Sequence, residues 1–533
     1  MAEDTHRAGR GWPELDRRGR QALAALIPDP RTLCAAGGKA AEYRQQYAAL
    51  TGSPIGSLPL TQPGAVPALF TRARAAGRKW DALGFRERRR IILRFTDLLL
   101  ALRDPLLDLL QWENGKDRGS AFEEYYDAVQ NCLFYARRAH RILRARKVPG
   151  AIPLLTSVTV RYRAKGAVGI ISPWNYPLSL AFSDAVAALM AGNAVVLKPD
   201  SLTPYSALAV KSLLLRAGLP RDVFSVAVGS GRALGAAFAA NADYLMFTGS
   251  TAVGRSAAAA AGENLIGVSA ELGGKNAMIV RADAPAARAA KSAVKACFSS
   301  SGQLCVSVER IYVHENIWDT FVPAFLAAVK TMKTGVSMDW DTDMGPLISE
   351  KQMRKVNAHV RDALSKGATV LAGGIADPKN SGRIFPPTVL TGVTREMDLF
   401  AQETFGPVVA LYRVGGDSEA VELANAVRYG LNSVIWTGDF AAGRALAKKL
   451  ETGLVNINDG YAAAWGSVHA PLGGMKDSGL SYRHGREGIV KYTDIQTVAA
   501  QKLMTVSPPP HVGEKMWAAG LTAYARIRRK FGI

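Results

Sequence analysis

The sequence predicts an α/β fold in which parallel strands form doubly wound sheets covered by helices. Two observations support this prediction. From residue 166 onward, short apolar runs alternate with Ala-rich amphipathic segments, and a second alternation of the same kind runs from about 296 to 470. Such alternation is typical of parallel strands joined by crossover helices. The chain has 533 residues, 48% of them hydrophobic and 21% charged, which suffices for about two to four globular domains.

The first unit is expected to contain four strand–helix pairs. Its strands are expected at 166–171, 194–198, 223–228 and 244–247. A helix follows each strand, and these helices are expected at 178–191, 205–217, 232–239 and 250–261. Two long helical patterns precede this unit, over 88–102 and 123–143. In the second unit we expect strands at 311–313 and 369–371 and helices at 317–332 and 352–365.

The cysteines and the apolar runs indicate a protein of the reducing cytoplasm. No CxxC pair occurs among the four cysteines, so we expect neither a disulfide framework nor a metal site. Residues 1–30 lack the apolar core of a signal peptide. The best candidate for a membrane span, 178–197, is interrupted by Asp184 and Asn193, so no span is expected.

The chain is strongly basic, with 66 Lys and Arg against 45 Asp and Glu and a formal charge of +21. The basic residues are spread along the chain, with local clusters at 86–94, 137–147 and 526–530. No aromatic-rich RNA-binding pattern accompanies them, so we expect no nucleic-acid partner and interpret the first two clusters as solvated helix faces. The tail from 516 to 533 has an amphipathic pattern, which suits either weak binding to anionic membranes or packing on a neighbouring subunit.

Cys305 is the candidate nucleophile. It lies in Ser-Ser-Gly-Gln-Leu-Cys-Val-Ser, where the glycine suggests a turn that presents the thiol. A thiolate attacks electrophiles well, although a cysteine among apolar residues is more often inert core.

Two further side chains suit the chemistry of a carbonyl. Glu271, in Ala-Glu-Leu-Gly-Gly-Lys-Asn, is a carboxylate between apolar residues, and burial would make it a base near neutral pH. The alternative is a charged residue at a strand end. Asn175, in Ser-Pro-Trp-Asn-Tyr-Pro, follows an expected strand and could donate to an oxyanion, or it could simply be a turn residue.

The segment 248–254, Thr-Gly-Ser-Thr-Ala-Val-Gly, joins a strand to a helix. Its backbone N–H groups and the helix dipole could hold a phosphate, although the spacing is not GxGxxG. Lys198 ends another expected strand and could meet a phosphate or a ribose, or could be an ordinary surface lysine.

Taken together and in order, these motifs resemble the aldehyde dehydrogenase superfamily from about residue 60 to 500. Seven segments carry the resemblance: 172–177, 192–199, 247–250, 271–276, 302–305, 403–407 and 471–479. Within the superfamily the chain is most similar to an NADP-dependent succinate-semialdehyde dehydrogenase branch, through 243–247, 302–310 and 483–488.

The resemblance implies a role for each matched residue. Cys305 would be the nucleophile and Glu271 the base for the deacylating water. Asn175 and the Cys305 amide would form the oxyanion hole, and Glu403 would bind the nicotinamide ribose. The remaining implied cofactor contacts are Trp174, Lys198, Gly249, Ser250 and Leu272.

The resemblance also implies a domain plan and a homodimer or homotetramer. We expect an N-terminal extension (1–50) and an NAD(P)-binding domain (51–295) to which a late segment (471–491) returns. We also expect a catalytic domain (296–470), a small β-arm that joins subunits (148–164 and 492–503) and a basic tail (504–533). Two positions depart from the family. Asp184 stands where many members have lysine, and Ser183 stands where better-known succinate-semialdehyde enzymes have arginine.

The cofactor is expected to be NADP, with NAD also accepted. Ser201 stands where NAD-preferring relatives commonly have a glutamate that binds the adenosine ribose, and a serine removes its repulsion of a 2′-phosphate. Lys198 adds positive charge, whereas Asp200 argues against this assignment. Alternatively, Ser201 only caps the following helix.

For the substrate we expect succinate semialdehyde first, on the resemblance. Leu304, Val306 and Trp465 favour apolar walls, so an aromatic or aliphatic aldehyde is the alternative. A semialdehyde carboxylate would want a cation, with Arg483 and His469 as candidates. From other classes, a thiol acyltransferase or hydrolase would need a histidine partner, which no motif supplies, and a non-catalytic membrane-surface protein would not need the catalytic set.

Overall fold

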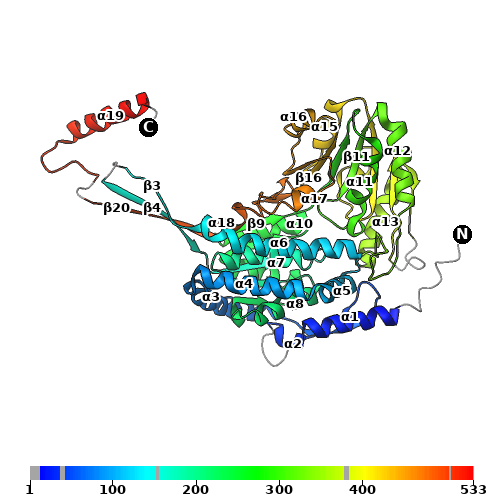
Figure 1. The fold of residues 1–533 in the computed structure, drawn as a ribbon, viewed down its shortest axis with the longest axis horizontal. Coiled ribbons are helices and arrows are strands. Elements are labelled where there is room, and N and C mark those ends of the chain that lie inside the picture. Colours follow the sequence, from blue (N-terminus) through cyan, green and yellow to red (C-terminus); the bar gives the residue numbers. More distant parts are fainter. Residues whose placement is uncertain (1–11, 36–41, 152–154, 377–382, 503–505, 532–533) are drawn as a thin grey trace.

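The computed structural model describes residues 12–35, 42–151, 155–376, 383–502 and 506–531. Parts of the expected extension (1–11, 36–41), arm (152–154, 503) and tail (504, 505, 532, 533) lie outside these ranges. Figure 1 shows two α/β bodies side by side, with a narrow β-arm projecting from the first and a helix beyond the end of the arm. The predicted fold class is confirmed.

The first body is built on a six-stranded sheet, in which every strand but the short edge strand β19 is parallel to its neighbours. In spatial order its strands are β19 (Gly479–Leu480), β9 (Gly267–Glu271), β8 (Tyr244–Thr248), β5 (Ala167–Ile171), β6 (Ala194–Lys198) and β7 (Phe224–Val226). The crossover helices are α7 (Ser179–Met190), α8 (Pro204–Arg216), α9 (Gly231–Asn241) and α10 (Thr251–Glu263). All four strand–helix pairs predicted from 166 to 261 are thus present.

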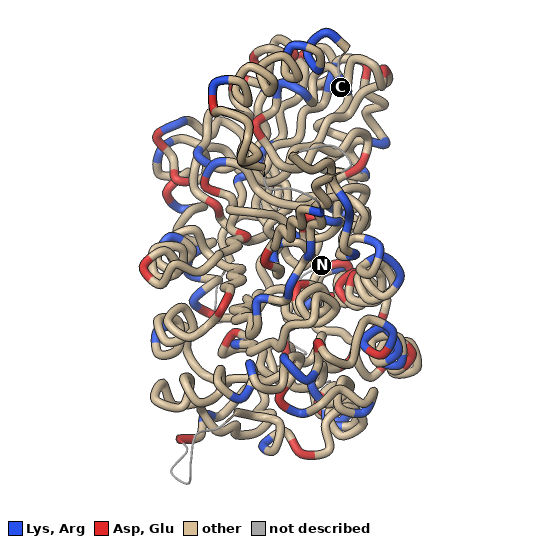
Figure 2. The backbone as a smooth tube through the Cα atoms, turned by 90° about the vertical axis from the view of Figure 1, so that its left-hand side faces the viewer, with Lys and Arg blue, Asp and Glu red and all other residues tan. Residues whose placement is uncertain are grey.

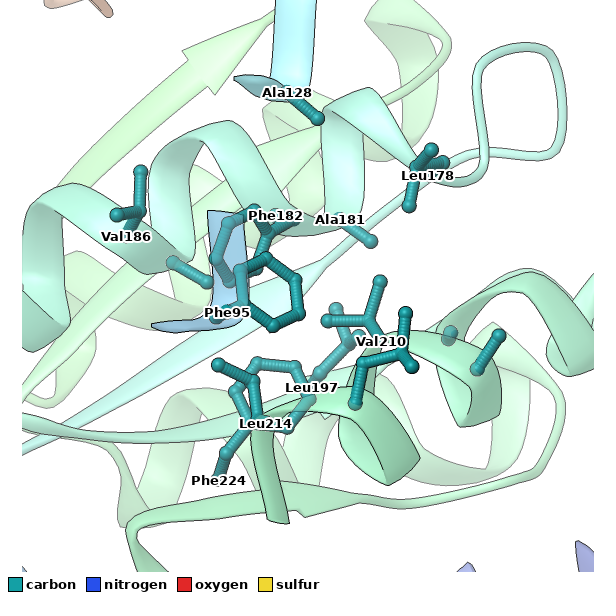
Figure 3. Packing of buried hydrophobic residues seen from close by; sticks show 14 of the residues in the cluster. Phe95, Ala128, Leu178, Ala181, Phe182, Val186, Leu197, Val210, Leu214 and Phe224 are labelled. Carbon is teal, nitrogen blue, oxygen red and sulfur yellow. The ribbon is translucent and has the colours of Figure 1, made fainter. Parts of the chain in front are cut away.

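Long helices precede this sheet and cover it. They are α3 (Val66–Ala82), α4 (Gly84–Ala101), α5 (Arg103–Asn114) and α6 (Arg118–Leu143). Figure 3 shows their packing, with Phe95 of α4 against Phe182 of α7, ring centroids 4.5 Å apart, above side chains of β6 and α8. Each strand residue from 194 to 198 is buried, as expected for a central parallel strand with helices on both faces.

The second body is built on a seven-stranded sheet, parallel except for the pairing of β12 with β13. Its order is β12 (Thr369–Ala372), β13 (Thr388–Thr391), β14 (Val408–Val414), β11 (Val308–His314), β10 (Asn276–Val280), β16 (Asn432–Trp436) and β17 (Leu454–Ile457). Its main helices are α11 (Ala286–Phe298), α12 (Glu315–Lys330), α13 (Glu350–Ser365), α15 (Asp417–Asn425) and α16 (Phe440–Ala447). Strand β10 belongs to the second sheet but lies before the expected domain boundary at 295/296. The chain therefore crosses from the first sheet to the second directly after Glu271-Leu-Gly-Gly, earlier than expected.

The N-terminal segment is docked on the first body. Helix α1 (Trp12–Leu26) lies so close to α5 that a Cβ atom on Gly19 would be 2.2 Å from the ring of Trp112. Asp16 accepts a hydrogen bond from Nε1 of Trp112 at 2.8 Å, and Leu26 is fully buried. A short helix, α2 (Pro30–Leu33), follows. The described part of residues 1–50 therefore contributes to the core of the first body.

The arm is a three-stranded antiparallel sheet in the order β20 (Thr493–Gln501), β4 (Thr156–Ala164) and β3 (Arg146–Pro149). Helix α19 (Glu514–Phe531) follows it. Figure 2 shows basic and acidic positions interspersed over one face of the molecule. Among the described residues, no helix combines the length and the apolar character needed to cross a bilayer.

Candidate active site

A cavity of about 200 Å³ opens at the carboxyl ends of β5, β8 and β9 and is closed from the other side by the second body. This edge of a parallel sheet is where sites form in doubly wound folds. Most of the predicted site residues line the cavity together: Trp174, Asn175, Gly249, Ser250, Glu271, Leu272, Cys305 and Glu403.

A left-handed turn leads to Cys305. Ser300, Ser301 and Gly302 have φ angles of 51°, 58° and 66°, a backbone conformation that side chains disfavour. A Cβ atom on Gly302 would lie 2.2 Å from the carbonyl oxygen of Gly406, so only glycine fits there. The turn predicted from the sequence is present, and it brings a half-buried thiol to the cavity.

The thiol of Cys305 is held in its neutral form by its surroundings. Burial raises its pKa to about 12, the positive charge of Arg483 opposes this shift, and the negative charge of Glu271 adds to it. Because only the thiolate is a strong nucleophile, attack by this sulfur requires a group that takes its proton.

Glu271 is suited to take protons near neutral pH. It is the last residue of β9 and is buried, and its Oε1 atom has no hydrogen-bond partner among the described residues. Burial raises its pKa to about 7, although the positive charges of Arg483 and Lys491 oppose the shift. A carboxylate with this pKa, facing a cavity with a free oxygen, can act as a general base.

Asn175 lies in a turn that other buried groups hold in place. Its Nδ2 atom donates to the carbonyl oxygen of Gln303 at 3.0 Å, next to the nucleophile's own loop. The carbonyl of Trp174 accepts from Asn114 and that of Asn175 from Lys116, each at 2.7 Å. An amide nitrogen has two hydrogens, so Nδ2 keeps one donor for a ligand oxygen.

Sequence reasoning missed the buried pair that supports this turn and the helix after it. Nζ of Lys116 lies 2.5 Å from Oε2 of Glu124, and both side chains are fully buried. The other carboxylate oxygen of Glu124 accepts from the backbone N–H groups of Leu178 and Ser179, at the start of α7. The pair joins α6 to α7, and no local motif marks it because both residues look like part of a solvated helix face.

The two departures from the family are both explained by buried partners. Asp184 on α7 is ion-paired with Arg483 and Lys491, each at 3.2 Å, so its charge is balanced by cations from the C-terminal segment. Ser183 donates to Asp127 at 2.7 Å. There is thus no cation at position 183 to bind a substrate carboxylate.

The opposite end of the cavity has donors for a phosphate and an acceptor for a ribose. Ser250 lines the cavity and is the N-cap of α10, and it makes no side-chain cap bond, so its hydroxyl does not occupy the first N–H groups of the helix. Glu403 accepts from the Gly274 N–H at 2.9 Å, and burial raises its pKa to about 7. These groups fit the phosphate and ribose parts of a dinucleotide.

Lys198 and Ser201 are not in the lining of this cavity but lie at the end of the adjoining strand β6. Lys198 Nζ and the Ser201 hydroxyl both donate to the carbonyl oxygen of Gly229, at 3.4 and 3.3 Å. The helix-cap alternative for Ser201 is wrong, because the N-cap of α8 is Thr203. Asp200 accepts from the N–H of Leu202 at 2.9 Å.

Around the thiol, the cavity borders an apolar and aromatic cluster. It contains the predicted wall residues Leu304, Val306 and Trp465, together with Tyr176 and Tyr461. The hydroxyl of Tyr176 is buried, and no residue in the described part of the chain hydrogen-bonds to it. The two candidates for binding a substrate carboxylate, Arg483 and His469, are engaged elsewhere. Arg483 is ion-paired with Asp184, and the ring of His469 packs on Phe134.

Comparison with known proteins agrees with this geometry. The sequence pattern of the aldehyde dehydrogenase family matches residues 37–498. The chain is 48% identical to a protein of Mycolicibacterium smegmatis named "putative succinate-semialdehyde dehydrogenase [NADP(+)]", over 90% of this chain and 93% of that one.

Two solved structures are similar along most of the chain. One is a succinate-semialdehyde dehydrogenase from Burkholderia pseudomallei, with a TM-score of 0.83 and 34% identity over 86% of this chain and 95% of that one. The other is a P. syringae indole-3-acetaldehyde dehydrogenase in complex with NAD+, with a TM-score of 0.85 and 29% identity over 91% and 99%. The chain therefore belongs to the aldehyde dehydrogenase family.

Proposed function

We propose that this protein oxidises succinate semialdehyde to succinate, with NADP as the preferred cofactor and NAD as a second one, through a thioester on Cys305. The observation that carries the proposal is the meeting of Cys305, Glu271 and Asn175 in one cavity that is also lined by Gly249, Ser250 and Glu403. The identity to the mycobacterial relative supports the choice of substrate and cofactor.

In the first step, Glu271 takes the thiol proton, directly or through water, and the Cys305 sulfur attacks the aldehyde carbon. A C–S bond forms and the carbonyl electron pair moves to oxygen, which gives a thiohemiacetal alkoxide. The free N–H of the Asn175 amide and the Cys305 backbone N–H stabilise this oxyanion. When bound, the nicotinamide cofactor supplies the acceptor for the hydride that leaves this carbon.

Before the second step, Glu271 releases the thiol proton to bulk water and is a carboxylate again. It then removes a proton from water, and the resulting hydroxide attacks the thioester carbon. The C–S bond breaks, the sulfur leaves as thiolate, and the acid is released. Glu271 suits this step because its Oε1 has no other partner and its pKa lies near the working pH. The active form of the base is the carboxylate, so deacylation accelerates as Glu271 loses its proton.

We propose that the 2′-phosphate of NADP lies near Lys198 and Ser201. The two side chains share the Gly229 carbonyl as acceptor, and Asp200 is engaged by the N–H of Leu202. A polyanion there would meet a cation and a hydroxyl donor, with the neighbouring carboxylate already hydrogen-bonded.

We propose a cytoplasmic homodimer or homotetramer joined through the arm. The long strands β4 and β20 are half-buried or exposed for most of their length, which a second subunit would cover. The four cysteines are all free, in keeping with a reducing compartment.

An aromatic aldehyde is the second candidate substrate, favoured by the aromatic side chains beside Cys305. The test compares kcat/KM for succinate semialdehyde, benzaldehyde and a medium-chain fatty aldehyde, each with NADP and NAD. Succinate semialdehyde should give the highest value. A much higher efficiency with benzaldehyde would replace the substrate and leave the thioester chemistry intact, whereas no reduction of either cofactor would refute the proposal as a whole.

A further inference from the structure

The C-terminal helix α19 (Glu514–Phe531) has no buried residue over its full length. Figure 1 shows it beyond the free end of the arm, apart from both α/β bodies. An isolated helix in water gains little from propensity alone, so an amphipathic helix of this length normally rests on something that covers its apolar side.

One side of α19 is apolar and aromatic. Met516, Tyr524, Ile527 and Phe531 follow one another at spacings that place them on one face, and Trp517 lies beside them. Ile527 is 54% exposed and Phe531 67% exposed. A monomeric protein seldom leaves such a continuous apolar strip in water.

The rest of the helix is basic: it has four of the five Lys and Arg side chains, against the single acid Glu514, while Arg528 lies at the edge of the apolar side over the ring of Tyr524. Three of the basic residues, Arg528, Arg529 and Lys530, are in the last turn. A helix with an aromatic and aliphatic face and Lys and Arg on its other side matches the composition of helices that lie in the surface of a bilayer.

We propose that α19 binds an anionic membrane surface, with its apolar face inserted among the lipid chains and its basic side chains on the headgroups. Charge favours this partner over a second copy of the chain. Anionic headgroups neutralise the basic side chains of the helix, whereas a second copy of α19 would bring the same five basic side chains toward them. The inserted helix would hold the arm and the α/β bodies next to the membrane.

Sedimentation with vesicles tests the proposal on the full-length protein. The vesicles contain either phosphatidylcholine alone or phosphatidylcholine with phosphatidylglycerol. Full-length protein should sediment with the anionic vesicles and remain in solution with the neutral ones, and a chain ending at residue 513 should remain in solution with both. Because α19 makes no part of the cavity, dehydrogenase activity should be unchanged by the truncation, which also shows that the shortened chain folds.

Two matched double variants separate insertion from simple charge attraction. Leu521→Glu with Ile527→Glu places two acids on the apolar side, and Ala518→Glu with Thr522→Glu places two acids on the opposite side. Both pairs change the charge equally. Insertion predicts that the first pair lowers the vesicle partition coefficient on the order of ten-fold more than the second.

Equal losses in the two variants would overturn insertion, as would full-length protein that fails to sediment with anionic vesicles. Light scattering measures the oligomeric mass and so tests the alternative partner, a second copy of the chain. If truncation lowers the oligomeric mass while no form of the protein binds vesicles, then α19 packs on a second copy of the chain and the membrane proposal is wrong.

Discussion

Nη2 of Arg483 lies 3.2 Å from Oδ2 of Asp184, and both side chains are buried next to the candidate active site. Arg483 also donates to the Thr248 hydroxyl at 2.8 Å, at the end of β8 and directly before Gly249 and Ser250 of the cavity lining. The positive charge of Arg483 lowers the pKa of Glu271 and the negative charge of Asp184 raises it. Burial is the main cause of the raised pKa of Glu271, and the two charges of the ion pair change that pKa in opposite directions.

Replacing either partner should shift the pH dependence in a defined direction. Arg483→Met removes a charge that favours the carboxylate, so the midpoint of the deacylation-limited rate should rise from near pH 7. Asp184→Asn removes a charge that opposes the carboxylate, so the midpoint should fall. The measurement is kcat from pH 5.5 to about 9. Midpoints that both move in the same direction would contradict this electrostatic account.

In the wild-type enzyme, the deacylation rate should increase with pH and then level off. Below pH 7 most of Glu271 is protonated, so the rate should rise about ten-fold per pH unit, and above about pH 8 it should be flat. Glu271→Gln should remove the rise as well as most of the rate. A rise of the same size in that variant would assign the titration to another group.

Cys305→Ala should abolish oxidation while the fold is retained. Loss of the sulfur removes the covalent intermediate, and we expect activity to fall by at least about a thousand-fold. Cofactor reduction at 340 nm measures the loss, with circular dichroism as the check on folding. Cys297→Ala is the matched control, because Cys297 is buried in the second body and does not line the cavity. An equal loss of activity in Cys297→Ala and Cys305→Ala would contradict the assignment of Cys305 as the nucleophile.

Glu271→Gln should slow the second half-reaction more than the first. Rapid mixing should show a burst of reduced cofactor close to one equivalent per site, followed by turnover slowed by about a hundred-fold or more. The amide keeps the size of the side chain, so the cavity should not collapse. Burst and steady state reduced by the same factor would mean that Glu271 acts mainly in acylation.

Ser201→Glu should turn the cofactor preference toward NAD. A glutamate at the end of β6 would bring a second carboxylate toward a 2′-phosphate, and we expect the ratio of kcat/KM for NADP over NAD to fall by about ten-fold or more. Ser201→Ala is the comparison variant: it removes the proposed hydroxyl donor without adding a carboxylate, so it should lower the ratio by less than Ser201→Glu does. A wild-type enzyme that strongly prefers NAD would exclude this site for the phosphate.

Breaking the buried pair of Lys116 and Glu124 should destabilise the protein strongly. Lys116→Met leaves a buried carboxylate without its cation, and a loss of about 3–5 kcal/mol in the free energy of unfolding is expected. Lys116→Met combined with Glu124→Leu removes both charges and should cost less than the sum of the single variants. Breaking the exposed pair of Arg17 and Glu14 should leave Tm unchanged. Denaturant titrations of wild type, Lys116→Met, Glu124→Leu and the double variant measure the first differences, and thermal unfolding measures the Tm of the variant that lacks the exposed pair.

The sequence predicts the local elements well because each depends on a short pattern. The strand at 194–198 and the turn before Cys305 are as expected. The motifs of Asn175, Ser250 and Glu271 converge because each lies at or just after the end of a parallel strand of the first sheet. Helix α6 begins earlier than expected because Asp117 caps it, accepting from the Ser120 N–H at 2.8 Å.

Local sequence patterns do not predict which side chains from distant segments contact one another. Asp184 is a polar interruption in an apolar run until Arg483 and Lys491 are placed beside it. Likewise, nothing near Glu124 shows that its carboxylate meets the start of α7. The docking of α1 on Trp112 was missed for a similar reason, because a charged helix with a narrow apolar strip resembles a solvated extension.

The late return of the chain to the first sheet has a consequence for biosynthesis. Strand β19 pairs with β9 beside Glu271, and the N–H of Leu272 donates to the carbonyl of Ser478 at 2.9 Å, across an intervening stretch that contains the whole second sheet. A nascent chain in which β19 has not yet been synthesised already contains Cys305 and Glu271. In that chain the edge of β9 has no strand to pair with. The pairing beside the proposed base therefore forms only after residues 478–480 have been synthesised, and we expect chains that end before them to leave this edge of the site unpaired.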